Sequence, residues 1–191
     1  MFLSFLTLVS CGGGDGQGSV VWKSVASGFS HTVAIKPDGS LWAWGGNENG
    51  QLGDGTTIDK NTPTRIGSDN DWGQASVGGG NSGGISHSVA IKTDGTLWAW
   101  GKNIGQFGDG VTTSVISTPT RIGTGTDWKQ VDAGSTFIAA IKIEGTLWTW
   151  GSNYSGQLGN GSQSTPNVPT QVGTNTNWVR VSTGAYHSAA I

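Results

Sequence analysis

Residues 38–45 have the sequence Asp-Gly-Ser-Leu-Trp-Ala-Trp-Gly, and nearly the same residues recur at 94–101 and 144–151. Each copy begins with an acidic residue and a glycine, and a short apolar run precedes it. This arrangement is typical of a β-hairpin, because glycine supplies the positive φ that a tight turn needs. The three copies therefore predict three equivalent hairpins.

The rest of the sequence repeats in the same frame. A Gly-Gln-x-Gly-x-Gly turn and a Pro-Thr segment that ends in glycine follow each hairpin. A lone tryptophan then begins the next unit, and these units start near positions 22, 72, 128 and 178. The second unit is longer because a glycine-rich insertion lies within residues 79–84, and loops tolerate such insertions better than strands do.

Each unit predicts four short strands. In the first unit they follow from the polar–apolar alternation around Trp22, the apolar runs at 32–36 and 41–44, and the segment 64–66. Four strands in about fifty residues, with no helical periodicity, are typical of a β-propeller blade. We therefore predict an all-β fold in which residues 20–191 form about three four-stranded blades and the start of a fourth.

The composition agrees with this prediction. The chain has 191 residues, of which 34 are glycine and 10 are tryptophan, and only 12% are charged. Many short strands joined by glycine turns explain these values, whereas so many tryptophans argue against disorder. The formal net charge is −2 and no basic run is present, so we expect no nucleic-acid partner.

The N-terminus predicts export and a lipid anchor. Residues 1–11 are apolar or hydroxylic, and Leu8-Val-Ser-Cys11 resembles the bacterial lipobox. We interpret 1–11 as a signal peptide that lacks its basic start, Cys11 as the lipidated residue and 12–19 as a flexible tether. The expected location is the bacterial cell envelope, with the protein held on a membrane by its lipid. The alternative is a chance apolar start with an inert thiol.

Three motifs together point to a family: Gly28-x-x-His31-Thr-Val-Ala-Ile, the hairpin motif at 38–45 and Asn47-x-x-Gly50-Gln-Leu-Gly53. They resemble the repeats of the regulator of chromosome condensation family, in the Leu-Trp-Ala-Trp form of its bacterial branch. The resemblance covers about residues 20–191 and implies a propeller that usually has seven blades, about 350 residues in all. The chain is therefore expected to be an open arc, either a fragment of a seven-bladed parent or a unit that assembles with copies of itself.

Histidine recurs at one repeat position, as His31, His87 and His187, with Phe137 in the third unit. Equivalent positions in neighbouring blades point in equivalent directions around an axis, so the three side chains should not converge on a metal. We predict a structural role in which the imidazole bridges a turn by hydrogen bonds.

Two other sets of recurring residues also receive structural interpretations. The paired tryptophans, such as Trp42 and Trp44, lie two apart on one strand face. A stacking surface for sugars or nucleobases is one interpretation, but their recurrence in every unit favours packing between blades. Asp54, Asp109 and Asn160 in the Gly-Gln-x-Gly-x-Gly turns fit turn chemistry better than a calcium loop.

The sequence contains no arrangement that predicts catalysis. There is no nucleophile with a base and an orienting partner, no phosphate-binding loop that opens a helix, and no matched pair of carboxylates. We therefore expect no catalytic residue, metal, cofactor or nucleotide.

What varies between the units is the loops, and propellers recruit partners through loops held on rigid blades. We predict a non-catalytic binding scaffold that presents these loops to a protein or a glycan. One alternative is a propeller enzyme, a lyase or a glycan-active enzyme, with its catalytic residues in blades outside this chain. Another is a protein inhibitor of an envelope enzyme. The candidate contact residues are Asp59, Lys60, Asn61, Asn81, Ser82 and Ile116.

Overall fold

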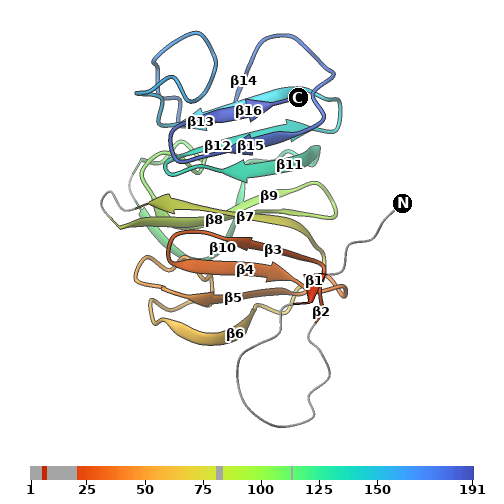
Figure 1. Cartoon of the computed structure of the whole chain (residues 1–191), viewed down its shortest axis with the longest axis vertical. Helices are drawn as coiled ribbons and strands as arrows, with labels where there is room; N and C mark the ends of the chain where they lie inside the picture. Colours follow the sequence, from red (N-terminus) through yellow and green to blue (C-terminus); the bar gives the residue numbers. More distant parts are fainter. Residues whose placement is uncertain (1–5, 8–20, 81–83, 113) are drawn as a thin grey trace.

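The structure is a computed structural model that describes residues 6–7, 21–80, 84–112 and 114–191. The described residues form strands and connecting turns and include no helix. Three four-stranded antiparallel sheets lie side by side without closing into a ring (Figure 1). The prediction of an all-β, incomplete propeller is therefore confirmed.

Each four-stranded sheet is one blade, with its strands in sequence order. Blade 1 consists of β3 (Ser24–Ser27), β4 (His31–Ile35), β5 (Leu41–Gly45) and β6 (Lys60–Ile66). Blade 2 consists of β7 (Trp72–Gly80), β8 (Ile85–Lys92), β9 (Leu97–Asn103) and β10 (Ser114–Ile122). Blade 3 consists of β11 (Trp128–Ala133), β12 (Phe137–Lys142), β13 (Leu147–Gly151) and β14 (Thr170–Gln171).

Two short pairs of strands flank the blades. The fourth unit consists of β15 (Val181–Thr183) and β16 (Ser188–Ala190), and β1 (Leu6–Thr7) pairs with β2 (Val21–Trp22). The first strand of blade 2, β7, contacts β3 and β4 of blade 1 and β11 of blade 3. The first strand of each blade therefore lies on the inner side of the arc, as in a propeller.

The strand connections divide between two faces of the arc. The hairpin face carries the turns β4–β5, β8–β9 and β12–β13, which lie on the right in Figure 1. At the first turn Gly39 has a φ of 80°, and a Cβ there would collide with the carbonyl of Asn70. The loop face, on the left, carries the connections between the first and second strands and between the third and fourth strands of each blade.

The hydrophobic core lies between the blades. One cluster joins Leu52 and Ile66 of blade 1 to Trp100 of blade 2, and a second joins Phe107 of blade 2 to Trp150 of blade 3. Both tryptophans have no exposed surface. The prediction that the paired tryptophans pack between blades is therefore confirmed for Trp100 and Trp150, whereas Trp42 and Trp44 are half-buried beside Trp22.

The glycines of the Gly-Gln-x-Gly turn make room for these tryptophans. A Cβ on Gly53 would lie 2.7 Å from Nε1 of Trp100, and a Cβ on Gly108 would lie 2.7 Å from Nε1 of Trp150. At Gly159, by contrast, a Cβ would meet nothing within 4 Å. The recurring glycine and the recurring tryptophan thus form one contact, made between successive blades.

Candidate functional site

The first predicted histidine, His31, joins blade 1 to blade 2. Its Nε2 lies 2.9 Å from Oγ of Ser88, and that hydroxyl donates to the carbonyl of Gln51 at 2.8 Å. Because a serine hydroxyl has one proton, His31 must donate from Nε2. The predicted hydrogen-bonding role is confirmed for His31, although the bond crosses to the next blade rather than a turn.

The second histidine, His87, lacks such a bond. It is fully buried, and neither ring nitrogen has a hydrogen-bond partner among the described residues. The position that corresponds to Ser88 in the next blade is occupied by Ile138, which offers no hydroxyl. Burial lowers the pKa of His87 to about 3 and that of His31 to about 4, so both rings are neutral. For His87 the predicted hydrogen-bonding role is wrong.

The inner strands are joined by polar side chains that the sequence analysis missed. Gln74 donates from Nε2 to the carbonyl of Val131 at 2.9 Å and accepts from its N–H at 3.1 Å. Asp132 accepts a hydrogen bond from the hydroxyl of Ser76 at 2.7 Å and from the N–H of Thr183 at 2.7 Å. The sequence contained a signal for these contacts, because polar residues follow the lone tryptophan in successive units.

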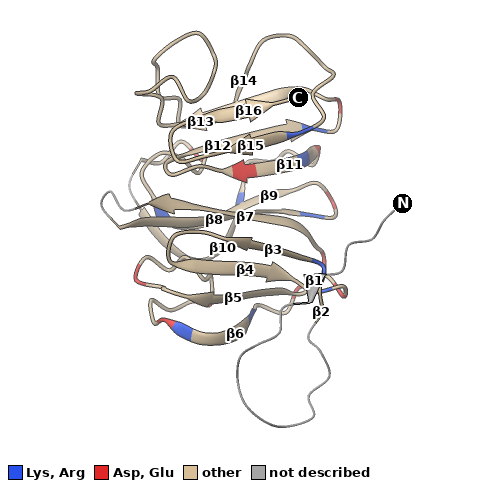
Figure 2. Ribbon diagram, in the orientation of Figure 1, with Lys and Arg blue, Asp and Glu red and all other residues tan. Residues whose placement is uncertain are grey.

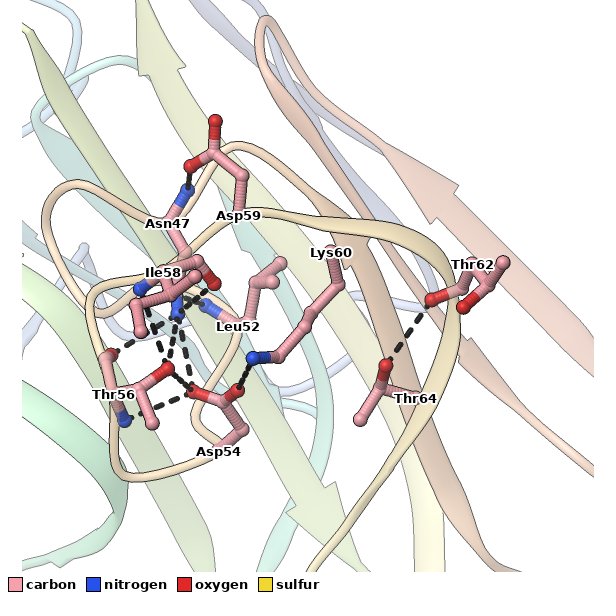
Figure 3. A network of polar contacts seen from close by, with 9 residues as sticks. All are labelled: Asn47, Leu52, Asp54, Thr56, Ile58, Asp59, Lys60, Thr62 and Thr64. Atoms are coloured by element: carbon pink, nitrogen blue, oxygen red, sulfur yellow. Dashed lines mark hydrogen bonds and ion pairs between the residues drawn. The ribbon is translucent and has the colours of Figure 1, made fainter.

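A buried asparagine organises each long loop on the loop face, and Figure 3 shows the one in blade 1. In blade 1, Asn47 has no exposed surface. Its Nδ2 donates to the carbonyl of Thr56 at 3.0 Å and to that of Ile58 at 3.2 Å, and its Oδ1 accepts from the N–H of Leu52 at 3.0 Å. Asn103 and Asn153 are equally buried in blades 2 and 3. The loops are therefore tied to their blades.

The acidic turn residue completes this arrangement. Asp54 accepts a hydrogen bond from Asn47 at 3.1 Å and forms an ion pair with Lys60 at 3.1 Å. Partial burial alone would raise the pKa of Asp54, but hydrogen bonds, first from Thr56 and then from Lys60 and Asn47, outweigh it and lower the pKa. Asp109 and Asn160 accept from the corresponding asparagines. The prediction that these residues serve the turn is confirmed.

The loop face also exposes large apolar and aromatic side chains. Tyr154 is 82% exposed and Tyr186 52%, and both lie at a cleft of about 540 Å³ between blade 2, blade 3 and the fourth unit. Phe29, Ile58 and Ile104 are further exposed apolar side chains on this face. Neither tyrosine could be singled out from the repeats, because each occurs in only one unit.

The hairpin face has a different chemistry. Lysines there lie over tryptophan rings, as Lys92 does at 4.9 Å from Trp72 and 4.8 Å from Trp98. Lys92 also pairs with Asp69 at 2.6 Å and Asp71 at 3.0 Å. Much of the chain's charge lies near these turns (Figure 2). This face combines lysines that lie over tryptophan rings with acidic turns, whereas the loop-face cleft is uncharged.

Within the described residues, no group of three or more His, Cys, Asp or Glu side chains could hold a metal ion. Across the same ranges, no helix is long and apolar enough to cross a membrane. Cys11 lies outside the described residues.

Comparison with known proteins identifies the family. The family model described as the regulator of chromosome condensation (RCC1) repeat matches residues 38–91 and 144–191, and a second model of the same description matches 22–51, 82–108 and 128–157. The chain belongs to the RCC1 repeat family.

Several RCC1-type proteins are similar to this chain. It is 35% identical over 103 residues to a protein RCC2 homolog of Xenopus laevis, which covers 52% of this chain and 19% of that protein. It is 37% identical over 79 residues to the ultraviolet-B receptor UVR8 of Arabidopsis thaliana, covering 41% of this chain and 17% of the receptor. The chain thus spans about a fifth of the length of these curated relatives.

Two solved structures share the fold. Human WBSCR16 is 25% identical, with a TM-score of 0.72 over 87% of this chain and 43% of that one. Prp20p from Saccharomyces cerevisiae is also 25% identical, with a TM-score of 0.72 over 88% of this chain and 43% of that one.

The predicted contact residues of this RCC1-repeat chain lie in different environments. Asp59 is exposed, and its carboxylate accepts from the N–H of Asn47 at 2.7 Å. Asn61 is exposed, whereas Lys60 is half-buried in its ion pair. Ile116 is half-buried and packs against both inter-blade clusters. Asn81 and Ser82 lie outside the described residues.

Proposed function

We propose that this protein is a non-catalytic interaction scaffold that presents its loop face to a protein or glycan partner. The observation that carries the proposal is the exposure of Tyr154, Tyr186, Ile104 and Phe29 on loops of one face. Apolar side chains that gather on one exposed surface mark interaction sites more often than scattered ones do.

The construction of the loops supports this role. Asn47, Asn103 and Asn153 are fully buried, and each holds its loop by several hydrogen bonds. A loop that is already ordered loses less conformational entropy on binding, so more of the contact energy appears as affinity. The blades therefore supply a rigid frame, and the loop residues that differ between units supply specificity.

The comparison with Prp20p also supports a binding role. Its structure was described together with its binding to Gsp1p and histones, so a propeller of this family can act by binding proteins. The partners of that protein are not transferred to this chain, because specificity lies in surface residues rather than in the fold. In the proposed scaffold the buried neutral His31 and His87 serve the inter-blade core, and neither is among the residues that line the loop-face cleft.

A cross-linking experiment tests the proposal. A photoreactive phenylalanine derivative is placed at Ile104 or Tyr154 on the loop face, and at Ile143, which is 66% exposed on the hairpin face, as a matched control. After irradiation in an envelope extract of the source organism, both loop-face positions should yield an adduct that excess unlabelled protein suppresses. Adducts only at position 143, or at none of the three positions, would contradict the scaffold proposal.

We also propose that the protein is exported and held on a bacterial envelope membrane through Cys11. The proposal rests on the Leu8-Val-Ser-Cys11 motif and the glycine-rich 12–19 that follows it. The RCC1-type repeats would then be linked to the membrane through the glycine-rich segment 12–19. Expressed in a bacterial host with its leader, the protein should partition into detergent, and Cys11→Ala should abolish this. If the Cys11→Ala variant still partitions into detergent like the parent, the lipid-anchor proposal is contradicted.

A further inference from the structure

The loop-face cleft contains no charged side chain. Its walls come from the connections of blades 2 and 3 and from the fourth unit, and every lining residue is uncharged. Residues 145–179, which supply much of the wall, contain no Lys, Arg, Asp or Glu at all. The loops of blade 3, at the upper left of Figure 2, carry no coloured segment. A charged ligand would lose its water here without gaining an ion pair.

The corresponding loop of blade 1 offers a contrast within the same chain. It contains Asp54, Asp59 and Lys60, with Lys60 paired to Asp54 (Figure 3). The second cleft, of about 430 Å³ on the hairpin face, is lined by Lys92, Asp94 and Lys129 among others. Lack of charge is therefore not common to every depression in the fold.

Two aromatic rings stand at the cleft with most of their surface in solvent. Tyr154 is 82% exposed and Tyr186 is 52% exposed, and both line the cleft together with Ile85 and Ile104. Tyrosine offers a large rigid face at low entropic cost and a hydroxyl that can donate or accept a hydrogen bond. Such rings suit a ligand that has an apolar face and polar edges.

The remaining polar groups of the cleft are mostly hydroxyls. Thr112, Ser135, Thr136 and Thr165 supply side-chain hydroxyls, each of which can both donate and accept. Asn167 donates from Nδ2 to the carbonyl of Gly110 at 2.9 Å, which holds its side chain in place. A ligand rich in hydroxyl groups would match this lining in both hydrogen-bonding directions.

Several main-chain N–H groups of the cleft are already hydrogen-bonded within the protein and are less available to a ligand. The N–H of Gly151 donates to the carbonyl of Pro166 at 2.7 Å, and the N–H of Ser152 donates to that of Thr136 at 2.9 Å. The N–H of Ser135 donates to the carbonyl of Ala185 at 3.3 Å. An extended peptide that binds by strand addition needs such groups free. These contacts favour a ligand held by side chains over a peptide held by main-chain hydrogen bonds.

We propose that the loop-face cleft binds an uncharged oligosaccharide, with Tyr154 and Tyr186 stacking against sugar rings and the surrounding hydroxyls bonding to its hydroxyl groups. This inference rests on the proposed scaffold function and names the class of ligand for one of its surfaces. The volume of about 540 Å³ falls within the range of small-ligand sites, about 300–1,000 Å³.

Isothermal titration calorimetry tests the proposal on the full chain. The probes are cellohexaose, mannohexaose, maltohexaose and chitohexaose, with a galacturonic acid hexamer as the charged control. At least one neutral hexamer should bind, and the charged hexamer should bind at least about tenfold more weakly. Tyr154→Ala and Tyr186→Ala should each weaken binding about tenfold.

Matched variants separate stacking from general damage. Tyr154→Phe keeps the ring and should stay within about threefold of the parent, and Ile143→Ala removes an exposed apolar side chain on the hairpin face and should change nothing. Circular dichroism verifies that each variant is folded. Binding of no neutral hexamer, preference for the charged hexamer, or alanine variants that bind like the parent would each overturn the oligosaccharide assignment.

Calorimetry and cross-linking together distinguish a wrong oligosaccharide assignment from a wrong scaffold proposal. If no hexamer binds but Ile104 and Tyr154 still cross-link a saturable protein partner, the scaffold stands and the ligand is a protein. If neither experiment gives binding, both proposals fail.

Discussion

Replacing His87 with phenylalanine should make the protein less sensitive to acid. The ring of His87 is fully buried without a hydrogen-bond partner among the described residues, and burial lowers its pKa from 6.5 to about 3. Below pH 6.5 the unfolded chain therefore takes up a proton that the folded protein does not. The stability that the neutral ring contributes is complete above that pH and is lost as the pH falls toward 3.

The size of this effect follows from the pKa shift. Each pH unit below the unfolded pKa costs about 1.4 kcal/mol, which amounts to about 2 kcal/mol at pH 5. Phenylalanine is the residue that blade 3 uses at the equivalent position, where Phe137 is also fully buried. In His87→Phe this proton uptake is absent, so the loss of unfolding free energy from about pH 7.5 to about pH 5 should shrink by about 2 kcal/mol.

Urea denaturation at the two pH values, followed by tryptophan fluorescence, measures this difference directly. The reverse exchange, Phe137→His, should add pH dependence of the same sign, because position 137 is equally buried. Comparing each variant with itself at two pH values cancels any packing change that is independent of pH. Equal pH dependence in the parent and in His87→Phe would refute the claim that a neutral histidine is buried there.

Five further substitutions, used in three experiments, test the packing and the loops. Trp150→Ala should lower the free energy of unfolding by about 3–5 kcal/mol, and Trp44→Ala by less, because Trp150 has no exposed surface and Trp44 is half-buried; urea denaturation measures both. Gly108→Ala should destabilise more than Gly161→Ala in the same assay, because both have positive φ but only Gly108 abuts a tryptophan; equal losses would contradict that contact. Asn47→Ala should speed amide hydrogen exchange in residues 48–60 by about tenfold or more, since it removes the loop's buried hydrogen-bonding centre; unchanged exchange would refute that role.

The sequence predicted what every unit shares, because a repeated residue performs the same packing in each blade. The hairpins, the four-stranded blades and the inter-blade tryptophans follow from this periodicity. The turn role of Asp54 could be predicted for the same reason, since glycines flank it in the repeated turn.

What could not be predicted depends on how unlike residues of neighbouring blades meet. His31 gains a hydrogen bond with Ser88, whereas the position equivalent to Ser88 in the next blade is Ile138 and His87 has no hydrogen-bond partner among the described residues, although the two histidines occupy the same repeat position. The loop-face cleft has the same origin. The cleft depends on Tyr154, and the first two units have no tyrosine at the equivalent position. It also depends on contacts between loops, which periodicity alone does not specify.

Hydrogen–deuterium exchange of the protein with and without its ligand tests the central claim, that the loop face binds a partner without altering it chemically. The ligand is the partner cross-linked at Ile104 or the hexamer that binds by calorimetry. Binding should slow exchange in residues 103–112 and 152–167, and mass spectrometry should recover the ligand unchanged. Slowed exchange confined to the hairpin turns at 36–40, 92–96 and 142–146, or a chemically altered ligand, would contradict it.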